Sequence, residues 1–158
     1  MSLSADIFTA EKAGFRERIA KLIGGTTYRE PMGGRSTDPG KMTDQDVAAA
    51  LAYARQGPDD IGPDIAYCIV CRSGWHRERI TLKLAEALYS RRLRGTRPYI
   101  LTIADQAFRA TVFCERVARP EGCPPRGYAS LLLAGASALQ NLADESIHRA
   151  ERAFRRAA

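Results

Sequence analysis

Positively charged side chains concentrate in one stretch of this 158-residue chain. The window from Cys71 to Arg97 holds eight arginine or lysine residues and two glutamates, a surplus of six that equals the chain's formal net charge of +6. Guanidinium and ammonium groups neutralise phosphates, and arginine also recognises guanine edges through two hydrogen bonds. We therefore expect a nucleic acid as the first partner. The candidate nucleic-acid-binding residues are Arg72, Arg77, Arg79, Lys83, Arg91, Arg92, Arg94 and Arg97.

The same block has two other interpretations, a solvated basic face and a surface that binds an acidic host protein. Trp75, the single tryptophan, lies beside these basic residues. It can stack on a base, contact a partner or pack back on the core to anchor a helix, and we favour the last. Leu82 and Tyr89 lie nearly opposite the apolar face of this segment. Trp75, Leu82 and Tyr89 are therefore the candidate interface residues.

Four cysteines, Cys68, Cys71, Cys114 and Cys123, have the spacings C-x2-C and C-x8-C, so a four-thiolate zinc site is an alternative. The first pair lies in an apolar run typical of a buried helix, whereas zinc knuckles use polar turns. We therefore expect metal-free thiols that act as small buried side chains. A nucleophilic pair of Cys71 and His76 has no spacing rule to support it.

No other motif identifies a reaction, so we expect neither enzymatic activity nor a cofactor. The glycine-rich segment 33–42 fails the phosphate-binding-loop pattern because Met42 follows Gly40-Lys41 and no strand precedes it. The adjacent carboxylates Asp59 and Asp60 are typical of a turn rather than of an acid–base pair.

Apolar residues recur at helical spacing along the chain, with glycine and proline between the segments, and strand-like runs are weak. The pattern predicts an all-α fold with a single helical domain of five to seven helices. Thr43 to Asp46 predicts a capping box, and Asp64 predicts a second helix cap. The expected helices are 4–23, 43–57, 64–71, 75–94, 98–118 and 128–154, the last with a break near Ala143-Asp144.

The two helices on either side of the Gly95–Pro98 connection are compatible with a helix-turn-helix-like pair. Along the chain we expect an N-terminal helix (1–23), a flexible Gly/Pro loop (24–42) and a helical core domain (43–158). A loop of that length is uncommon inside a compact domain. It either links an N-terminal arm, which can pair two chains in a homodimer, or becomes ordered on a partner.

The longest apolar stretch, 128–142, is too short and too interrupted to cross a membrane, so we expect no membrane partner. The N-terminus lacks the pattern of a secretion signal, which favours a cytoplasmic location. The short, basic, helical make-up is typical of small regulators carried by bacteriophages and mobile elements. The sequence therefore predicts a nucleic-acid-binding transcriptional regulator; the alternative is a protein-interaction module that binds and modulates a host protein.

Overall fold

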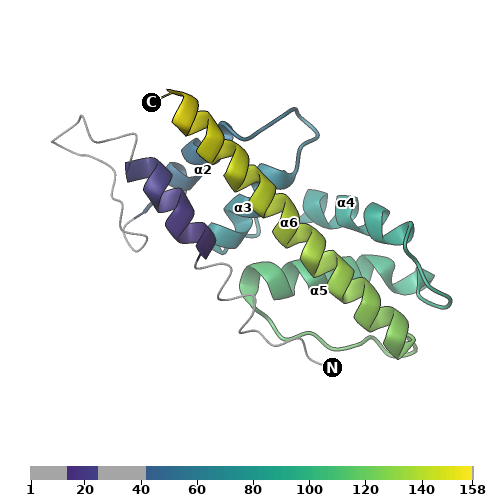
Figure 1. Cartoon of the computed structure of the whole chain (residues 1–158). Coiled ribbons are helices and arrows are strands. Elements are labelled where there is room, and N and C mark those ends of the chain that lie inside the picture. Colours follow the sequence, from purple (N-terminus) through teal and green to yellow (C-terminus); the bar gives the residue numbers. More distant parts are fainter. Residues whose placement is uncertain (1–13, 25–41, 158) are drawn as a thin grey trace.

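Helices account for all the regular structure in the computed structural model, which describes residues 14–24 and 42–157 (Figure 1). No strand occurs in these two ranges, so the prediction of an all-α fold is confirmed. Residues 14–24 are helical and precede the labelled elements. These are α2 (Asp44–Ala52), α3 (Gly62–Cys71), α4 (Arg77–Tyr89), the 3-10 turn η1 (Arg97–Tyr99), α5 (Ile100–Phe113) and α6 (Pro125–Ala157).

The long helix α6 crosses the molecule and packs against α2, α3, α4 and α5 (Figure 1). Its buried stripe contains Leu132, Leu139, Ala143 and Ile147, as the helical spacing predicts. The predicted break at Ala143-Asp144 is wrong. The stripe keeps its period through that point, with Ala143 buried in the core and Asp144 on the surface.

Local capping explains where α2 and α3 begin. The predicted capping box of α2 is confirmed, because the Asp46 N–H donates to Thr43 Oγ1 (3.2 Å) and the Thr43 N–H donates to Asp46 Oδ2 (3.1 Å). The predicted cap at Asp64 is wrong. Helix α3 begins two residues earlier, with Pro63 in its first turn, a position that needs no backbone N–H. Asp64 is instead a buried residue of α3.

The basic helix is shorter than predicted. Helix α4 runs from Arg77 to Tyr89. Trp75 and His76 therefore precede it, and the last three arginines of the predicted helix 75–94 follow it. His76 takes a left-handed conformation (φ 63°), which interrupts the helix before Arg77.

The pair α4 and α5 forms a helical hairpin. Ser90 to Tyr99, a connection of ten residues, separates them. This is longer than the three- or four-residue turn of a helix-turn-helix, so the predicted resemblance to that motif is wrong. Helix α5 also ends earlier than expected, at Phe113, because Cys114 adopts a left-handed conformation (φ 55°).

The helical residues 14–24 pack on the rest of the molecule. Phe15, Ile19 and Ile23 are buried in the same core as α3 and α6. The Arg18 guanidinium pairs with Asp144 (2.5 Å) and with Glu151, both on α6. The start of the predicted N-terminal helix and residues 25–41 of the predicted Gly/Pro loop lie outside the described residues.

Within the two described ranges, no helix is both long and apolar enough to cross a membrane. Helix α6 has the length, but it carries charged side chains along its exposed face.

Gly62 permits the close crossing of α3 and α6, and we expect Gly62→Ala to destabilise the protein by about 1–3 kcal/mol. An added Cβ would collide with Ser146 Oγ and lie 3.2 Å from the Leu142 carbonyl oxygen, both on α6. Urea unfolding followed by circular dichroism measures the change.

The matched control is Gly57→Ala, because a Cβ at Gly57 meets no atom within 4 Å. Its free energy of unfolding should stay within about 0.5 kcal/mol of the parent or rise slightly. Equal stability of the two variants would contradict the close crossing.

Candidate nucleic-acid interface

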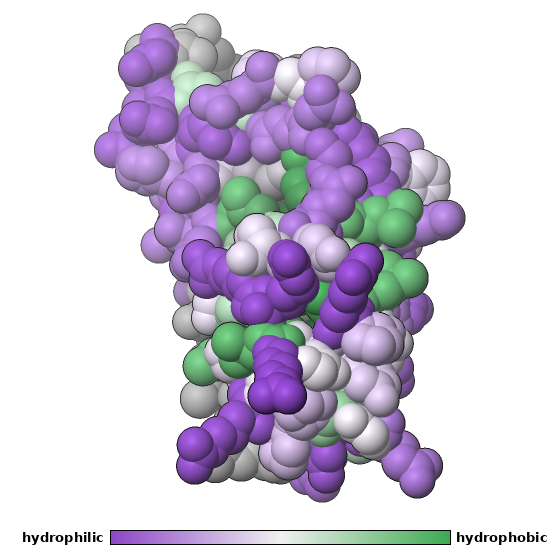
Figure 2. Space-filling view, turned by 90° about the vertical axis from the view of Figure 1, so that its right-hand side faces the viewer, coloured by the Kyte–Doolittle hydropathy of each residue, from purple (hydrophilic) through white to green (hydrophobic). Residues whose placement is uncertain are grey.

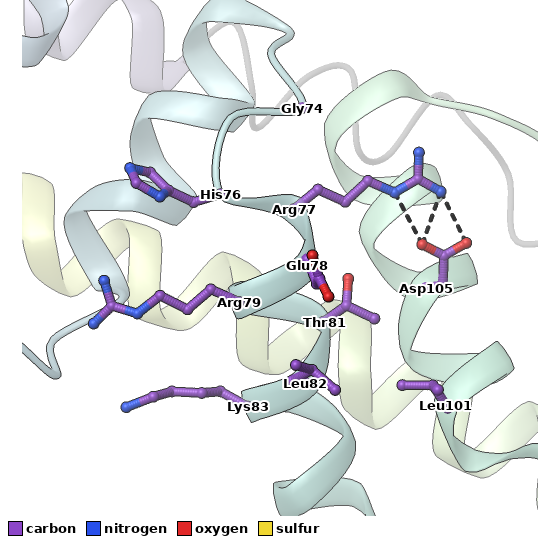
Figure 3. Close-up of a pocket in the computed structure, with 10 residues that line it drawn as sticks. All are labelled: Gly74, His76, Arg77, Glu78, Arg79, Thr81, Leu82, Lys83, Leu101 and Asp105. Atoms are coloured by element: carbon purple, nitrogen blue, oxygen red, sulfur yellow. Dashed lines mark hydrogen bonds and ion pairs between the residues drawn. The ribbon is translucent and has the colours of Figure 1, made fainter.

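The predicted binding residues divide into two groups according to their partners in the fold. Arg77, on α4, is engaged with α5 (Figure 3). Its guanidinium donates to Asp105 Oδ1 from Nε (3.0 Å) and Nη2 (2.8 Å), and Nη2 also lies 2.9 Å from Oδ2. This bidentate pair ties the two helices of the hairpin together.

Arg79 and Lys83 extend to the other side of α4, together with His76 (Figure 3). Arg79 donates to the carbonyl of Pro58 and lies 3.8 Å from Asp64 Oδ2. Lys83 Nζ donates to the carbonyl of Asp59 (3.0 Å). These cations hold the turn between α2 and α3 against α4, so much of their hydrogen-bonding capacity is already used inside the fold.

The second group lies on the connection between α4 and α5 and is exposed. We call Arg91, Arg92, Arg94 and Arg97 the arginine tip. Within the described part of the chain, none of the four forms an ion pair with a carboxylate. Residues 87–104 contain no aspartate or glutamate at all. Figure 2 faces the end of the molecule that carries this connection and shows a largely hydrophilic surface with separate apolar patches.

The backbone beneath the arginine tip is held in a defined turn. The Thr96 side chain is fully buried; its Oγ1 accepts from the Leu93 N–H (3.0 Å) and donates to the Leu93 carbonyl (2.5 Å). Gly95 takes a left-handed conformation (φ 80°) and packs close to Pro124. Because the turn is fixed, the four arginines project from a stable base rather than from a mobile loop.

Tyr89 gives the arginine tip an aromatic surface. Its ring lies 4.3 Å from Cζ of Arg92 and 5.7 Å from Cζ of Arg97. Cation–π contacts at these distances hold the guanidinium planes near the ring. The tip therefore combines positive charge with flat stacking groups.

Arg72 stands apart from both groups, exposed at the left-handed C-cap of α3 (φ 51°). The predicted set is therefore distributed over three places, and only the tip gathers several unpaired cations.

An open groove of about 1090 Å³ lies between α4 and α5. Leu82 and Leu101, about half exposed, lie opposite each other in it (Figure 3). Thr81 lines the same groove, and its buried hydroxyl has no hydrogen-bond partner among the described residues. Two of the three predicted interface residues, Leu82 and Tyr89, are exposed on α4, on the side away from its buried face.

The third predicted interface residue is Trp75, and its position differs from our expectation. It is 64% exposed, so the prediction that it packs back on the core is wrong. Its backbone is fixed while its ring stays outside: the Cys68 thiol donates to the Trp75 carbonyl (2.8 Å), and the Trp75 N–H donates to Ser73 Oγ (3.1 Å). The indole N–H donates to Nε2 of His76 (2.5 Å).

The sequence did not predict the cluster of charged side chains around the buried carboxylate of Asp64. Asp64 Oδ1 lies 2.7 Å from Nη2 of Arg55 and 3.9 Å from Nε2 of His76, and Arg79 approaches its other oxygen. Two cations and one imidazole therefore surround one carboxylate. The only sequence signal for this cluster is the density of charged residues after position 54, which does not identify the pairs.

The structure does not assemble the alternative zinc site. Among the described residues, no three His, Cys, Asp or Glu side chains come together as a metal-ligand group, and the four cysteines form no disulfide bond. Burial, followed by the negative charge of Asp64, raises the pKa of Cys68 to about 12. Burial and the neighbouring Asp44 raise the pKa of Cys71 to about 12. Neither thiol ionises near neutral pH, which argues against a nucleophilic Cys71.

No protein-family model, no curated protein and no solved structure matches this chain.

The raised thiol pKa values make stability fall with rising alkaline pH. In the unfolded chain thiols ionise near pH 9.0, but in the fold Cys68 and Cys71 keep their protons to about pH 12. Between these values the unfolded state binds fewer protons, so the free energy of unfolding falls as the pH rises, by at most about 1.4 kcal/mol per pH unit for each thiol.

Urea titrations at about pH 8 and about pH 10 test this expectation. The double variant Cys68→Ala/Cys71→Ala should lose less stability over that interval than the parent protein. An equal loss in both proteins would show that these thiols titrate normally in the fold.

Proposed function

We propose that this protein binds nucleic acid through the arginine tip, and that its narrower role is that of a non-enzymatic regulator. One observation carries the proposal: four exposed arginines without carboxylate partners project from an ordered turn. Phosphate contacts made by such side chains supply most of the sequence-independent affinity for nucleic acids.

The aromatic component of the tip supports the same partner. The Tyr89 ring with its neighbouring guanidinium planes offers a surface on which a base can stack. An acidic protein surface could also satisfy the charges, but it would not make use of a flat stacked face. We therefore place nucleic acid first.

Replacing Arg91, Arg92 and Arg94 by alanine should lower the salt dependence of binding. Each phosphate contact releases about one counterion, so the slope of log affinity against log salt should fall by about two to three if all three engage. Fluorescence anisotropy with labelled duplex and single-stranded oligonucleotides measures the slope over a series of salt concentrations.

The matched control is the triple alanine variant of Arg77, Arg79 and Lys83. It removes the same number of cations, but these are engaged with Asp105 and with the turn at residues 58–60. We expect the salt slope to stay close to that of the parent protein and the stability to fall by about 1–2 kcal/mol in total. If the control lowers the slope and the tip variant does not, the binding surface is the face of α4 instead.

A protein partner is the second candidate, and the groove between α4 and α5 is the observation that favours it. Exposed leucines facing each other are typical of a surface that receives an apolar side chain. The charged variant Leu82→Asp should abolish capture of a partner that survives nuclease treatment, whereas Leu133→Asp, on exposed α6 surface, should not. Capture that depends on intact nucleic acid would favour the first candidate.

A further inference from the structure

A second, smaller pocket of about 330 Å³ lies between α2, the first turns of α3 and the connection from α3 to α4. Its volume is that of a site for a small molecule rather than for a peptide or a duplex. It lies at the N-terminal end of α4, and the arginine tip follows the C-terminal end, about 20 Å away along a helix of 13 residues. The two features are therefore separate.

The walls of this pocket are mostly apolar and aromatic. Leu51 and Pro63 contribute aliphatic surface, together with two alanines of α2. Tyr67 and Trp75 contribute aromatic rings. Such walls with a few converging polar groups are typical of sites for small organic ligands.

Charged groups gather at one side of the pocket and directly beside it. Arg55, Asp64 and His76 line it, and Arg79 lies 3.8 Å from Asp64. The Asp64 carboxylate is 92% buried, and each of its oxygens faces a guanidinium. The nearby carboxylate of Asp60 pairs with an arginine of α6. Arg79 lines the neighbouring groove rather than this pocket, so two guanidinium groups, one in the pocket wall and one beside it, share the single Asp64 carboxylate.

Donors remain for a ligand after the internal hydrogen bonds are counted. Arg55 uses Nη1 and Nη2 on Asp64 and on the Asp60 carbonyl, which leaves its Nε–H. His76 accepts the Trp75 indole N–H at Nε2, so its other nitrogen, Nδ1, carries the proton. Nε–H of Arg55 and Nδ1–H of His76 are both suited to an anionic oxygen.

The pocket wall is fixed before any ligand arrives. Cys68 and Ser73 hold the Trp75 backbone on both sides, although the ring itself is exposed. The left-handed backbone at His76 is a strained conformation for a residue other than glycine, and such strain persists where the surrounding contacts impose it. A fixed wall lowers the entropic cost of binding.

We propose that this pocket binds a small organic carboxylate, with its apolar body against Tyr67 and Trp75 and its carboxylate facing Arg55 and His76. The proposal goes beyond nucleic-acid binding and does not depend on it, because it uses no residue of the arginine tip.

Benzoate is the probe, and benzamide and benzylammonium are its neutral and cationic analogues of nearly the same size. Trp75 is the only tryptophan, so its fluorescence reports on the pocket directly. We expect a saturable change in emission with benzoate, and an affinity for benzoate at least tenfold higher than for either analogue.

A pocket-filling variant tests the location without removing a charge. Ala52→Phe places a ring in the pocket from the exposed surface of α2 and should weaken benzoate binding at least tenfold. The control, Ala87→Phe, alters an exposed alanine of α4 outside the pocket and should bind as the parent does. Circular dichroism confirms that both variants fold.

Three results would overturn the proposal: no saturable emission change with benzoate, equal affinity for all three analogues, or undiminished binding by folded Ala52→Phe. Oligonucleotide binding is measured on the same variants. It should be unchanged by Ala52→Phe and by benzoate, so failure of this site and failure of the arginine tip are recognised separately.

Discussion

Close packing along α6 is the constraint on which the rest of this structure depends. Two glycines bring the other helices near enough to bury its apolar stripe. Gly62 of α3 lets that helix lie close to Ser146 of α6. Gly135 of α6 also lets α5 lie close, because a Cβ at Gly135 would lie 3.0 Å from the Cβ of Ala107. Close approach of backbones increases the dispersion contacts and the buried apolar area per residue. The positions of α3 and α5 then determine where the α4 hairpin stands.

The hairpin position decides which cations are available to a partner. The cations of α4 lie beside carboxylates and carbonyls of its neighbours, through Arg77, Arg79 and Lys83. Beyond Tyr89 the chain leaves these neighbours, and the following arginines have no carboxylate within the described residues to pair with. The same block of sequence therefore stabilises the fold at one end and faces solvent at the other.

Helical spacing and capping residues predicted the fold class, the capping box at Thr43 and the buried face of α6. They did not predict the bounds of α4, because the left-handed backbone at His76 delays its start to Arg77 and the helix stops at Tyr89, before Gly95. Arg55 and Asp64 are nine residues apart and meet only once α2 and α3 have packed. The sequence did not predict the exposure of Trp75 either, because the hydrogen bonds that fix its backbone come from Cys68 and Ser73.

Helix α6 also fixes the distance between the arginine tip and the opposite end of the molecule. Its first turn lies beside the arginine tip, and its 33 residues carry the chain to the opposite end of the molecule (Figure 1). At a rise of 1.5 Å per residue this is a rigid spacer of about 50 Å. A label placed in the last turn would therefore stand about 50 Å from a molecule bound at the tip, too far away to interfere with it.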